Sequence, residues 1–187
     1  MRLFVALEIP SEVRENLAAL LKSLRVVSPQ TRWVRPENLH VTLKFIGEVP
    51  ETKLAAVRNA LAGPRSEQPV ALDFRGLGFF PSEKQPRVFW AGIVASTNLK
   101  TLAADIDGAT EKLGIPREQR PFSPHLTLAR FDPPRLPETL RAAIQENTGR
   151  EFGSLRASQF HLIESKLKPS GAEYTTVESF PFAAVEA

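Results

Sequence analysis

Alternating apolar and polar residues predict the strands of this chain. Two mostly apolar runs begin at Arg2 (RLFVALEI) and at Arg87 (RVFWAGIV). Two further stretches alternate over residues 40–45 and 125–128, and a period of two is typical of a strand with one buried face. A last strand, about Tyr174 to Phe180, is predicted after the turn at residues 169–171.

Apolar residues spaced three or four positions apart predict four helices between these strands. The helices begin near Ser11, Glu51, Asn98 and Glu138, and Ser11 is of a type that caps helices. Glycine and proline stop signals follow at residues 63–64, 114–116 and 149. Each helix is expected to bury one apolar stripe, and the stripes consist of Val13, Leu17, Leu20, Leu21 and Leu24; Leu54, Val57 and Leu61; Leu99, Leu102, Ile106 and Leu113; Leu140 and Ile144.

The predicted elements recur in the same order at nearly one offset, which indicates an internal duplication. The runs at Arg2 and Arg87 are 85 residues apart, as are strands near Val70 and Leu155. The paired helices keep an offset of 87 residues. Identity between the halves is low, so the repeat is one of pattern. It predicts two similar lobes related by a pseudo-two-fold axis.

The spacing of the strands favours an α+β fold. Strand-turn-strand stretches near residues 70–95 and 155–182 are too closely spaced for helical crossovers, so a doubly wound parallel sheet is disfavoured. We expect mixed or antiparallel sheets with outer helices and a central cleft between the lobes. The chain is predicted to be one domain, residues 1–187, with halves of about 1–86 and 87–187.

Composition narrows the range of chemistry. The 187 residues are 42% hydrophobic, enough to bury a core without disulfides or a structural metal. The absence of cysteine excludes a thiol nucleophile and a zinc–thiolate site, and it fits a reducing compartment. The apolar run of residues 3–9 is too short for a signal peptide, and no segment is long enough to span a membrane, so we expect a cytoplasmic protein. A net charge of +3 permits a polyanionic substrate without indicating one.

Two of the three histidines open the same tetrapeptide, H-x-T-L. The motifs are His40 to Leu43 and His125 to Leu128, 85 residues apart. In a strand, residues two positions apart project from the same face, so each motif presents an imidazole beside a threonine hydroxyl. The aliphatic residues between them anchor the opposite face in a core.

Two such pairs facing one another would suit phosphodiester chemistry. An imidazole titrates near neutral pH, so one histidine can act as a base while the other acts as an acid. Thr42 and Thr127 could bond the non-bridging phosphate oxygens, and this scheme requires no metal ion or other cofactor.

The other candidate residues are weaker. Lys44 shares a face with His40 by strict alternation, although lysines at strand ends are usually solvent-exposed. His161 has no threonine two positions later and is expected to be a structural or surface histidine.

Aromatic and charged residues could make further contacts with a phosphodiester substrate such as a nucleic acid. Trp33, Phe79, Phe80 and Trp90 could stack on a base but are more often core residues; Phe79 and Phe80 are the most loop-like, as they precede Pro81. Charged residues at 82–87 and 117–120 could follow a nucleic-acid backbone, although such loops are usually only solvated.

Several blocks of this chain resemble the 2H phosphoesterase superfamily, and specifically the RNA 2',3'-cyclic phosphodiesterase family, also called 2'-5' RNA ligases. The similarity covers nearly the whole chain. The blocks that carry it are RLFVALEIP, NLHVTLKFIGEV, PRVFWAGI, RPFSPHLTLAR and ESKLKPSGAEYT.

This resemblance implies hydrolysis of a ribose 2',3'-cyclic phosphate at an RNA end to a 2'-phosphate and a free 3'-hydroxyl. It implies that His40 is the proton donor, that His125 is the acceptor that activates water, and that Thr42 and Thr127 hold the phosphate. It also implies reversible, ATP-independent 2'-5' joining of RNA, such as tRNA halves, at the same site. We expect the protein to act as a monomer.

The family pattern also places a basic residue of the second motif in the site, which corresponds to Arg130. Strict alternation from His125 puts Arg130 on the opposite face, so a bulge, or the end of the strand near residues 132–133, is needed to turn it inward. We expect Arg130 to assist phosphate binding; the alternative is a solvated charge at the strand end.

Two other functions stay open at this point. One is a non-catalytic module that binds RNA ends. The other is a 2H phosphodiesterase for a small cyclic nucleotide or for 2'-5' oligoadenylate.

Overall fold

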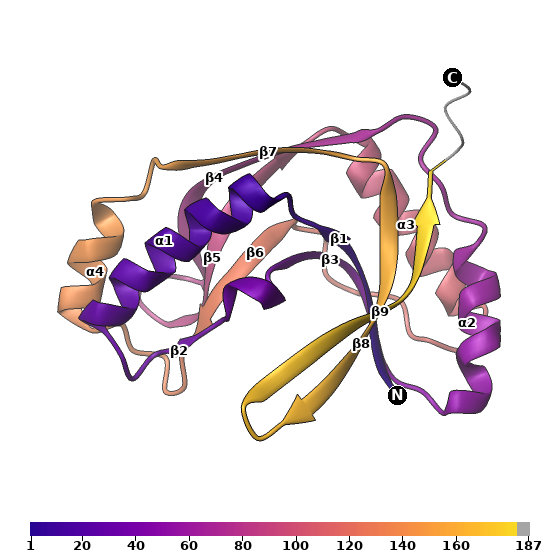
Figure 1. The fold of residues 1–187 in the computed structure, drawn as a ribbon, viewed down its shortest axis with the longest axis horizontal. Coiled ribbons are helices and arrows are strands. Elements are labelled where there is room, and N and C mark those ends of the chain that lie inside the picture. Colours follow the sequence, from indigo (N-terminus) through magenta and orange to yellow (C-terminus); the bar gives the residue numbers. More distant parts are fainter. Residues whose placement is uncertain (183–187) are drawn as a thin grey trace.

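The structure is a computed structural model, and it describes residues 1–182. It contains two antiparallel sheets and four α-helices (Figure 1). The strands are β1 (Arg2–Glu8), β2 (Arg32–Trp33), β3 (His40–Glu48), β4 (Val70–Pro81), β5 (Pro86–Ala95), β6 (His125–Arg130), β7 (Glu151–Ala157), β8 (Gln159–Lys168) and β9 (Gly171–Pro181). The helices are α1 (Ser11–Val27), α2 (Leu54–Leu61), α3 (Asn98–Glu111) and α4 (Glu138–Gln145), with short 3-10 helices at Pro36–Asn38 and Glu51–Lys53.

The two sheets have matching strand orders. One sheet has the order β3-β1-β8-β9, and the other has the order β2-β6-β5-β4-β7. Apart from the extra edge strand β2, each position in one sheet has a counterpart in the other: β3 with β6, β1 with β5, β8 with β4, and β9 with β7. This correspondence confirms the pseudo-two-fold relation and the α+β class.

Each sheet combines strands from both halves of the chain. The boundary near residue 86 falls at the start of β5, which forms a hairpin with β4, so the two strands on either side of the boundary are neighbours in one sheet. At the other end of the chain, β8 pairs with β1. The boundary therefore divides the sequence repeat but not the sheets.

The helices cover the sheets in two pairs, which lie at opposite ends of the molecule in Figure 1. Helix α1 contacts β7 and α4 beside the five-stranded sheet, whereas α2 and α3 contact each other and α3 contacts β3 of the four-stranded sheet. The predicted apolar stripes bury nearly all their residues; in α1, all five stripe residues are at most 1% exposed. No helix within residues 1–182 has the length and apolar character needed to cross a membrane.

Three local predictions differ from the structure. Helix α1 begins at Ser11, but no side chain caps its first turn. The helix expected from Glu51 starts as a 3-10 turn and becomes an α-helix at Leu54. Phe79 and Phe80 lie inside β4 and not in a loop, because β4 continues in register with β5 to Pro81.

Candidate active site

The two motif strands have the same burial pattern. Over His40–Phe45 and over His125–Arg130, the successive residues are half-buried, buried, half-buried, buried, buried and exposed. The histidine and threonine of each motif are the two half-buried positions. Strict alternation would not place two buried residues together, and the pairing of each strand explains this departure.

A β-bulge interrupts β3 immediately after its threonine. Thr42 pairs with Ala6 and Lys44 pairs with Val5, so Leu43 has no partner across the strand. Ala6 and Val5 are consecutive and project from opposite faces of β1. The bulge therefore places Lys44 on the face opposite to His40 and Thr42.

The prediction that Lys44 shares the face of the motif is thus wrong. Lys44 is 6% exposed, and its Nζ donates to the Asp107 carboxylate at 2.6 Å and to the Pro116 carbonyl at 2.7 Å. Asp107 belongs to α3, so Lys44 points toward the helices. It is also not the solvent-exposed lysine that its place in a strand suggested.

The second motif contains the same bulge at the same position. Thr127 pairs with Trp90 and Ala129 pairs with Phe89, which leaves Leu128 unpaired. The strands β3 and β6 thus share a one-residue bulge as well as the sequence motif. Bulges re-aim the side chains that follow them.

The bulge at Leu128 places Arg130 on the face of His125 and Thr127. Arg130 pairs with Val88, which lies two residues from Trp90 on the same face of β5. Arg32 of β2 pairs with Arg130 and extends this row of basic side chains. The inward turn that a role for Arg130 requires is therefore present.

A backbone carbonyl orients the ring of His40. Its Nδ1 lies 3.1 Å from the carbonyl oxygen of Asn38. A carbonyl only accepts, so this geometry assigns the proton to Nδ1 and leaves Nε2 as the reactive nitrogen. Phe4 packs edge-on at a centroid distance of 6.2 Å, and Tyr174 lies at 5.7 Å.

Hydrogen bonds to two other parts of the chain hold residues 35–38, the segment that supplies this carbonyl. The Asn38 side-chain amide donates to the Ala172 carbonyl at 2.9 Å, and Arg35 donates to the same oxygen. Arg14 of α1 donates to the Pro36 carbonyl. These bonds fix the segment that leads from β2 in one sheet to β3 in the other.

His125 repeats the arrangement of His40. Its Nδ1 lies 2.7 Å from the carbonyl oxygen of Ser123, again two residues before the histidine. Phe80 meets the ring edge-on at 5.0 Å, with an interplanar angle of 88°. Within residues 1–182, Nε2 of each motif histidine has no hydrogen-bond partner and can accept or donate a proton.

The surroundings of His40 change its protonation. Burial lowers the pKa of His40 below that of an ordinary histidine, although the hydrogen bond with the Asn38 carbonyl opposes this effect. The charges of Arg14 and His161 lower the pKa further, whereas that of Glu8 raises it. In the unliganded protein, His40 is therefore mostly neutral near pH 7.

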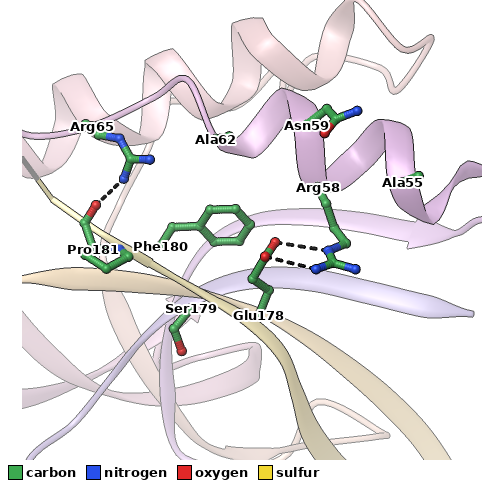
Figure 2. Close-up of a pocket in the computed structure, with 9 residues that line it drawn as sticks. All are labelled: Ala55, Arg58, Asn59, Ala62, Arg65, Glu178, Ser179, Phe180 and Pro181. Carbon is green, nitrogen blue, oxygen red and sulfur yellow. Dashed lines mark hydrogen bonds and ion pairs between the residues drawn. The ribbon is translucent and has the colours of Figure 1, made fainter.

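His161 lies on the same face as the first motif. It pairs with Ala6, the residue that separates it from Thr42, and its Nδ1 lies 2.8 Å from the Ser179 hydroxyl. Figure 2 shows Ser179 pointing away from α2, toward this face. His161 is 4% exposed, and burial lowers its pKa. The sequence gives no signal for this placement, because it depends on β8 pairing with β1.

The four aromatic candidates divide between the two faces. Trp33 donates to the Ser28 carbonyl and packs edge-on against Phe89, and Phe79 packs against Phe89 at 5.2 Å, so both belong to the core. Phe80 and Trp90 lie on the face of His125.

In the two charged segments, Arg117 pairs with Glu111 of α3, and Glu83 pairs with Arg141 of α4.

The fold brings the two motif strands together, since β3 and β6 contact each other where the sheets meet. The arrangement supplies two histidines with free Nε2 atoms, two half-buried threonines and an arginine. Within residues 1–182, no three His, Asp or Glu side chains gather in a group that could hold a metal ion. Histidines, threonines and an arginine are side chains that can transfer protons and donate hydrogen bonds around a bound anion.

A separate pocket of about 360 Å³ lies on the helix side of the four-stranded sheet (Figure 2). Its cations are already engaged: Arg58 makes two hydrogen bonds to Glu178, and Arg65 donates to the Pro181 carbonyl. Both histidine motifs lie outside its lining.

Comparison with known proteins gives one consistent result. The model of the LigT like phosphoesterase family matches residues 7–90 and again residues 93–174, once in each half of the repeat. The RNA 2',3'-cyclic phosphodiesterase of Methanothermobacter thermautotrophicus is 35% identical over 181 residues, which cover 96% of this chain and 98% of that protein.

Solved structures show the same fold over the full length. TT0787 of Thermus thermophilus has a TM-score of 0.77 at 35% identity and covers 100% of both chains. E. coli LigT complexed with 3'-AMP has a TM-score of 0.77 at 28% identity and covers 98% of both chains. As the resemblance predicted, this chain belongs to the LigT-like phosphoesterase family of the 2H phosphoesterase superfamily.

Proposed function

We propose that this protein hydrolyses 2',3'-cyclic phosphate ends of RNA to a 2'-phosphate and a free 3'-hydroxyl. The observation that carries the proposal is the duplicated geometry of the two motifs. Each histidine is held through Nδ1 by the carbonyl two residues before it, and each motif contains a bulge after its threonine. The choice of substrate is supported by relatives that are named RNA 2',3'-cyclic phosphodiesterase.

The reaction transfers two protons. Nε2 of neutral His125 removes a proton from water as the water oxygen bonds to phosphorus. The bond from phosphorus to O3' breaks, and O3' takes the proton of His40 Nε2. Thr42, Thr127 and Arg130 donate to the non-bridging oxygens as negative charge develops there. His125 leaves the reaction charged and His40 neutral, and exchange with solvent restores both.

This scheme requires a protonated His40, although burial lowers its pKa in the unliganded protein. A phosphodiester is an anion, and a nearby opposite charge raises the pKa of a histidine. Substrate binding therefore favours the acid form that the reaction needs. RNA also supplies the negative charge that the Arg32 and Arg130 row would attract.

The same groups support 2'-5' joining of RNA. In that direction a 5'-hydroxyl of a second RNA replaces water as the nucleophile, and His125 takes its proton. No nucleotide cofactor is needed, because the cyclic phosphate already holds the energy of the ester bond. Water and the 5'-hydroxyl thus compete as nucleophiles for the same bound cyclic phosphate.

The test is a short RNA with a 2',3'-cyclic phosphate end, incubated with the protein in excess EDTA. We expect a 2'-phosphate product, and His40→Ala and His125→Ala are each expected to lower turnover about 100-fold or more. His161→Ala is the matched control, because it removes a histidine from the same face but outside both motifs, and it is expected to cost far less.

The alternatives give different results in this assay. Binding of the RNA without turnover would replace the proposal by an RNA-end-binding module. Faster turnover of a small cyclic nucleotide or of 2'-5' oligoadenylate would change the substrate class. Near-wild-type turnover in either histidine variant would contradict the two-histidine mechanism.

A further inference from the structure

An aromatic shelf, formed by Trp90 and Phe80, lies on the face of the five-stranded sheet that carries His125. Trp90 pairs with Thr127 on one side and with Gly78 on the other. A Cβ atom placed on Gly78 would lie 2.3 Å from Cζ2 of Trp90, so the indole covers the backbone of Gly78. The ring lies along the sheet because residue 78 has no side chain.

Phe80 continues this surface to the catalytic histidine. Its ring centroid lies 5.3 Å from that of Trp90, and its ring meets His125 edge-on at 5.0 Å. Trp90 and Phe80 are both half-buried, so part of each ring stays accessible. A surface of aromatic rings thus extends from the imidazole of His125 across Phe80 of β4 and Trp90 of β5.

The other lobe has no such surface at the equivalent positions. In the four-stranded sheet, Thr42 pairs with Ala6, and Ala6 pairs with His161. The pair Ala6 and His161 thus stands where Trp90 and Gly78 stand in the five-stranded sheet. The two motifs are alike, but the aromatic neighbours of His40 are Phe4, which is only 6% exposed, and Tyr174, so the pair of half-buried rings beside His125 and Thr127 has no counterpart beside Thr42.

The geometry points to the aromatic shelf as the subsite for the nucleobase of the terminal nucleotide, next to its phosphate at His125 and Thr127. This inference rests on the proposed function. Bases of all kinds stack on aromatic rings, and each stacked base contributes substantially to binding. The Nε1 of Trp90 is buried and has no hydrogen-bond partner within residues 1–182, so the indole offers its ring and not its polar edge. We therefore expect the shelf to bind a base without strong selection among bases.

The test compares two small substrates that differ only in the base. One is adenosine 2',3'-cyclic phosphate, and the other is 1-O-methylribose 2',3'-cyclic phosphate, which has no base. Phe80→Leu and Trp90→Leu are each expected to lower kcat/KM for the adenosine substrate about ten-fold more than kcat/KM for the base-free substrate. Phe79→Leu is the matched control, because Phe79 is the next residue of β4 but packs in the core.

A binding measurement tests the shelf without turnover and without a change at the shelf. The chain contains two tryptophans, so Trp33→Phe leaves Trp90 as the only one. Adenosine 2'-phosphate is expected to quench the fluorescence of Trp90, whereas ribose 2-phosphate at the same saturation is not.

The ways in which these tests can fail are distinguishable. If the wild-type protein hydrolyses neither small substrate and also leaves the RNA with a cyclic phosphate end unchanged, the proposed function is overturned. If only the small substrates are left unchanged, the function stands. In both cases the fluorescence titration decides on the shelf. If the wild-type protein hydrolyses both small substrates, but Phe80→Leu and Trp90→Leu lower both rates equally, the shelf is overturned and the function stands. Absence of quenching by the adenosine nucleotide also overturns the shelf.

Discussion

The ion pair between Lys44 and Asp107 anchors the segment that leads into the second motif. Lys44 Nζ lies 2.6 Å from Asp107 Oδ1 and also donates to the Pro116 carbonyl, while Asp107 accepts the backbone N–H of Glu118 at 3.3 Å. This segment continues to Ser123, whose carbonyl orients His125. Loss of the pair should therefore affect both stability and turnover.

The two partners are buried to different degrees, and this sets the size of each effect. The side chain of Lys44 is 5% exposed and that of Asp107 is 17% exposed. Asp107→Asn leaves a cation with almost no access to water, which should cost about 3–5 kcal/mol of the free energy of unfolding. Lys44→Met should cost less, about 2 kcal/mol, because Asp107 can take water and keeps its bond to Glu118.

The double variant Lys44→Met/Asp107→Leu removes the charges of the ion pair but keeps the packing of its side chains. Both replacements are apolar and of similar volume, so we expect the double variant to lie within about 1 kcal/mol of the wild type. Urea unfolding at pH 7 of the wild type, Lys44→Met, Asp107→Leu and the double variant gives the coupling energy directly. Single-variant effects that simply add up in the double variant would refute the reasoning.

The pH dependence of stability gives a second measure of the same pair. Burial would raise the pKa of Asp107, but the hydrogen bonds from Lys44 and from the Glu118 N–H, with the charges of Lys44 and Arg117, lower it below the ordinary value. A carboxyl with a depressed folded-state pKa stabilises the fold above its unfolded pKa, and this stabilisation is lost as the pH falls through the folded value. The deficit of Asp107→Asn should therefore shrink below about pH 4. A deficit that is constant from pH 7 to pH 3 would mean that the charge of Asp107 does not matter.

Two further predictions concern the site itself. Glu8→Gln removes a negative charge near His40 and should lower the pKa of His40, which moves the alkaline limb of the kcat/KM profile to lower pH. Arg14→Gln removes a positive charge and should move this limb to higher pH. Shifts of the two variants in the same direction would contradict the assignment of His40 as the acid. Arg130→Ala should raise KM for the cyclic phosphate about ten-fold, as expected for loss of one charge-assisted hydrogen bond. Arg156→Ala, at an exposed position of β7, should leave KM unchanged. An unchanged KM in Arg130→Ala would assign Arg130 to the solvated strand end.

Hydrophobic periodicity predicted most of the strands, the four helices and the repeat, because these depend on residues close together in sequence; the short strand β2 was not predicted. The H-x-T-L motifs also predicted which side chains share a face, as far as the threonine. The prediction failed one residue later, at Lys44. Leu43 is apolar and buried whether or not the strand bulges, so hydrophobicity contains no sign of the bulge. The fate of Lys44 depends on Asp107, 63 residues away.

Pairing between distant strands was equally invisible in the sequence. The offset of 85 residues matched the strand near Val70 with one near Leu155, which is β7. In the sheets, however, the counterpart of β4 is β8, because β8 lies next to β1 as β4 lies next to β5. His161 reaches the site face only through this pairing. Its isolated sequence context therefore predicted a structural or surface residue.

The exchange of strands between the halves has a consequence for the origin of the fold. A single copy of the repeat, residues 1–86, would hold β1 and β3 of one sheet but β4 of the other. Its β1 would keep an open edge where β8 now pairs, and an open edge recruits another strand. A one-copy ancestor could thus complete its sheets only by assembling with a second copy. Fusion of the genes would turn that intermolecular assembly into one polypeptide, after which the two histidine environments could diverge.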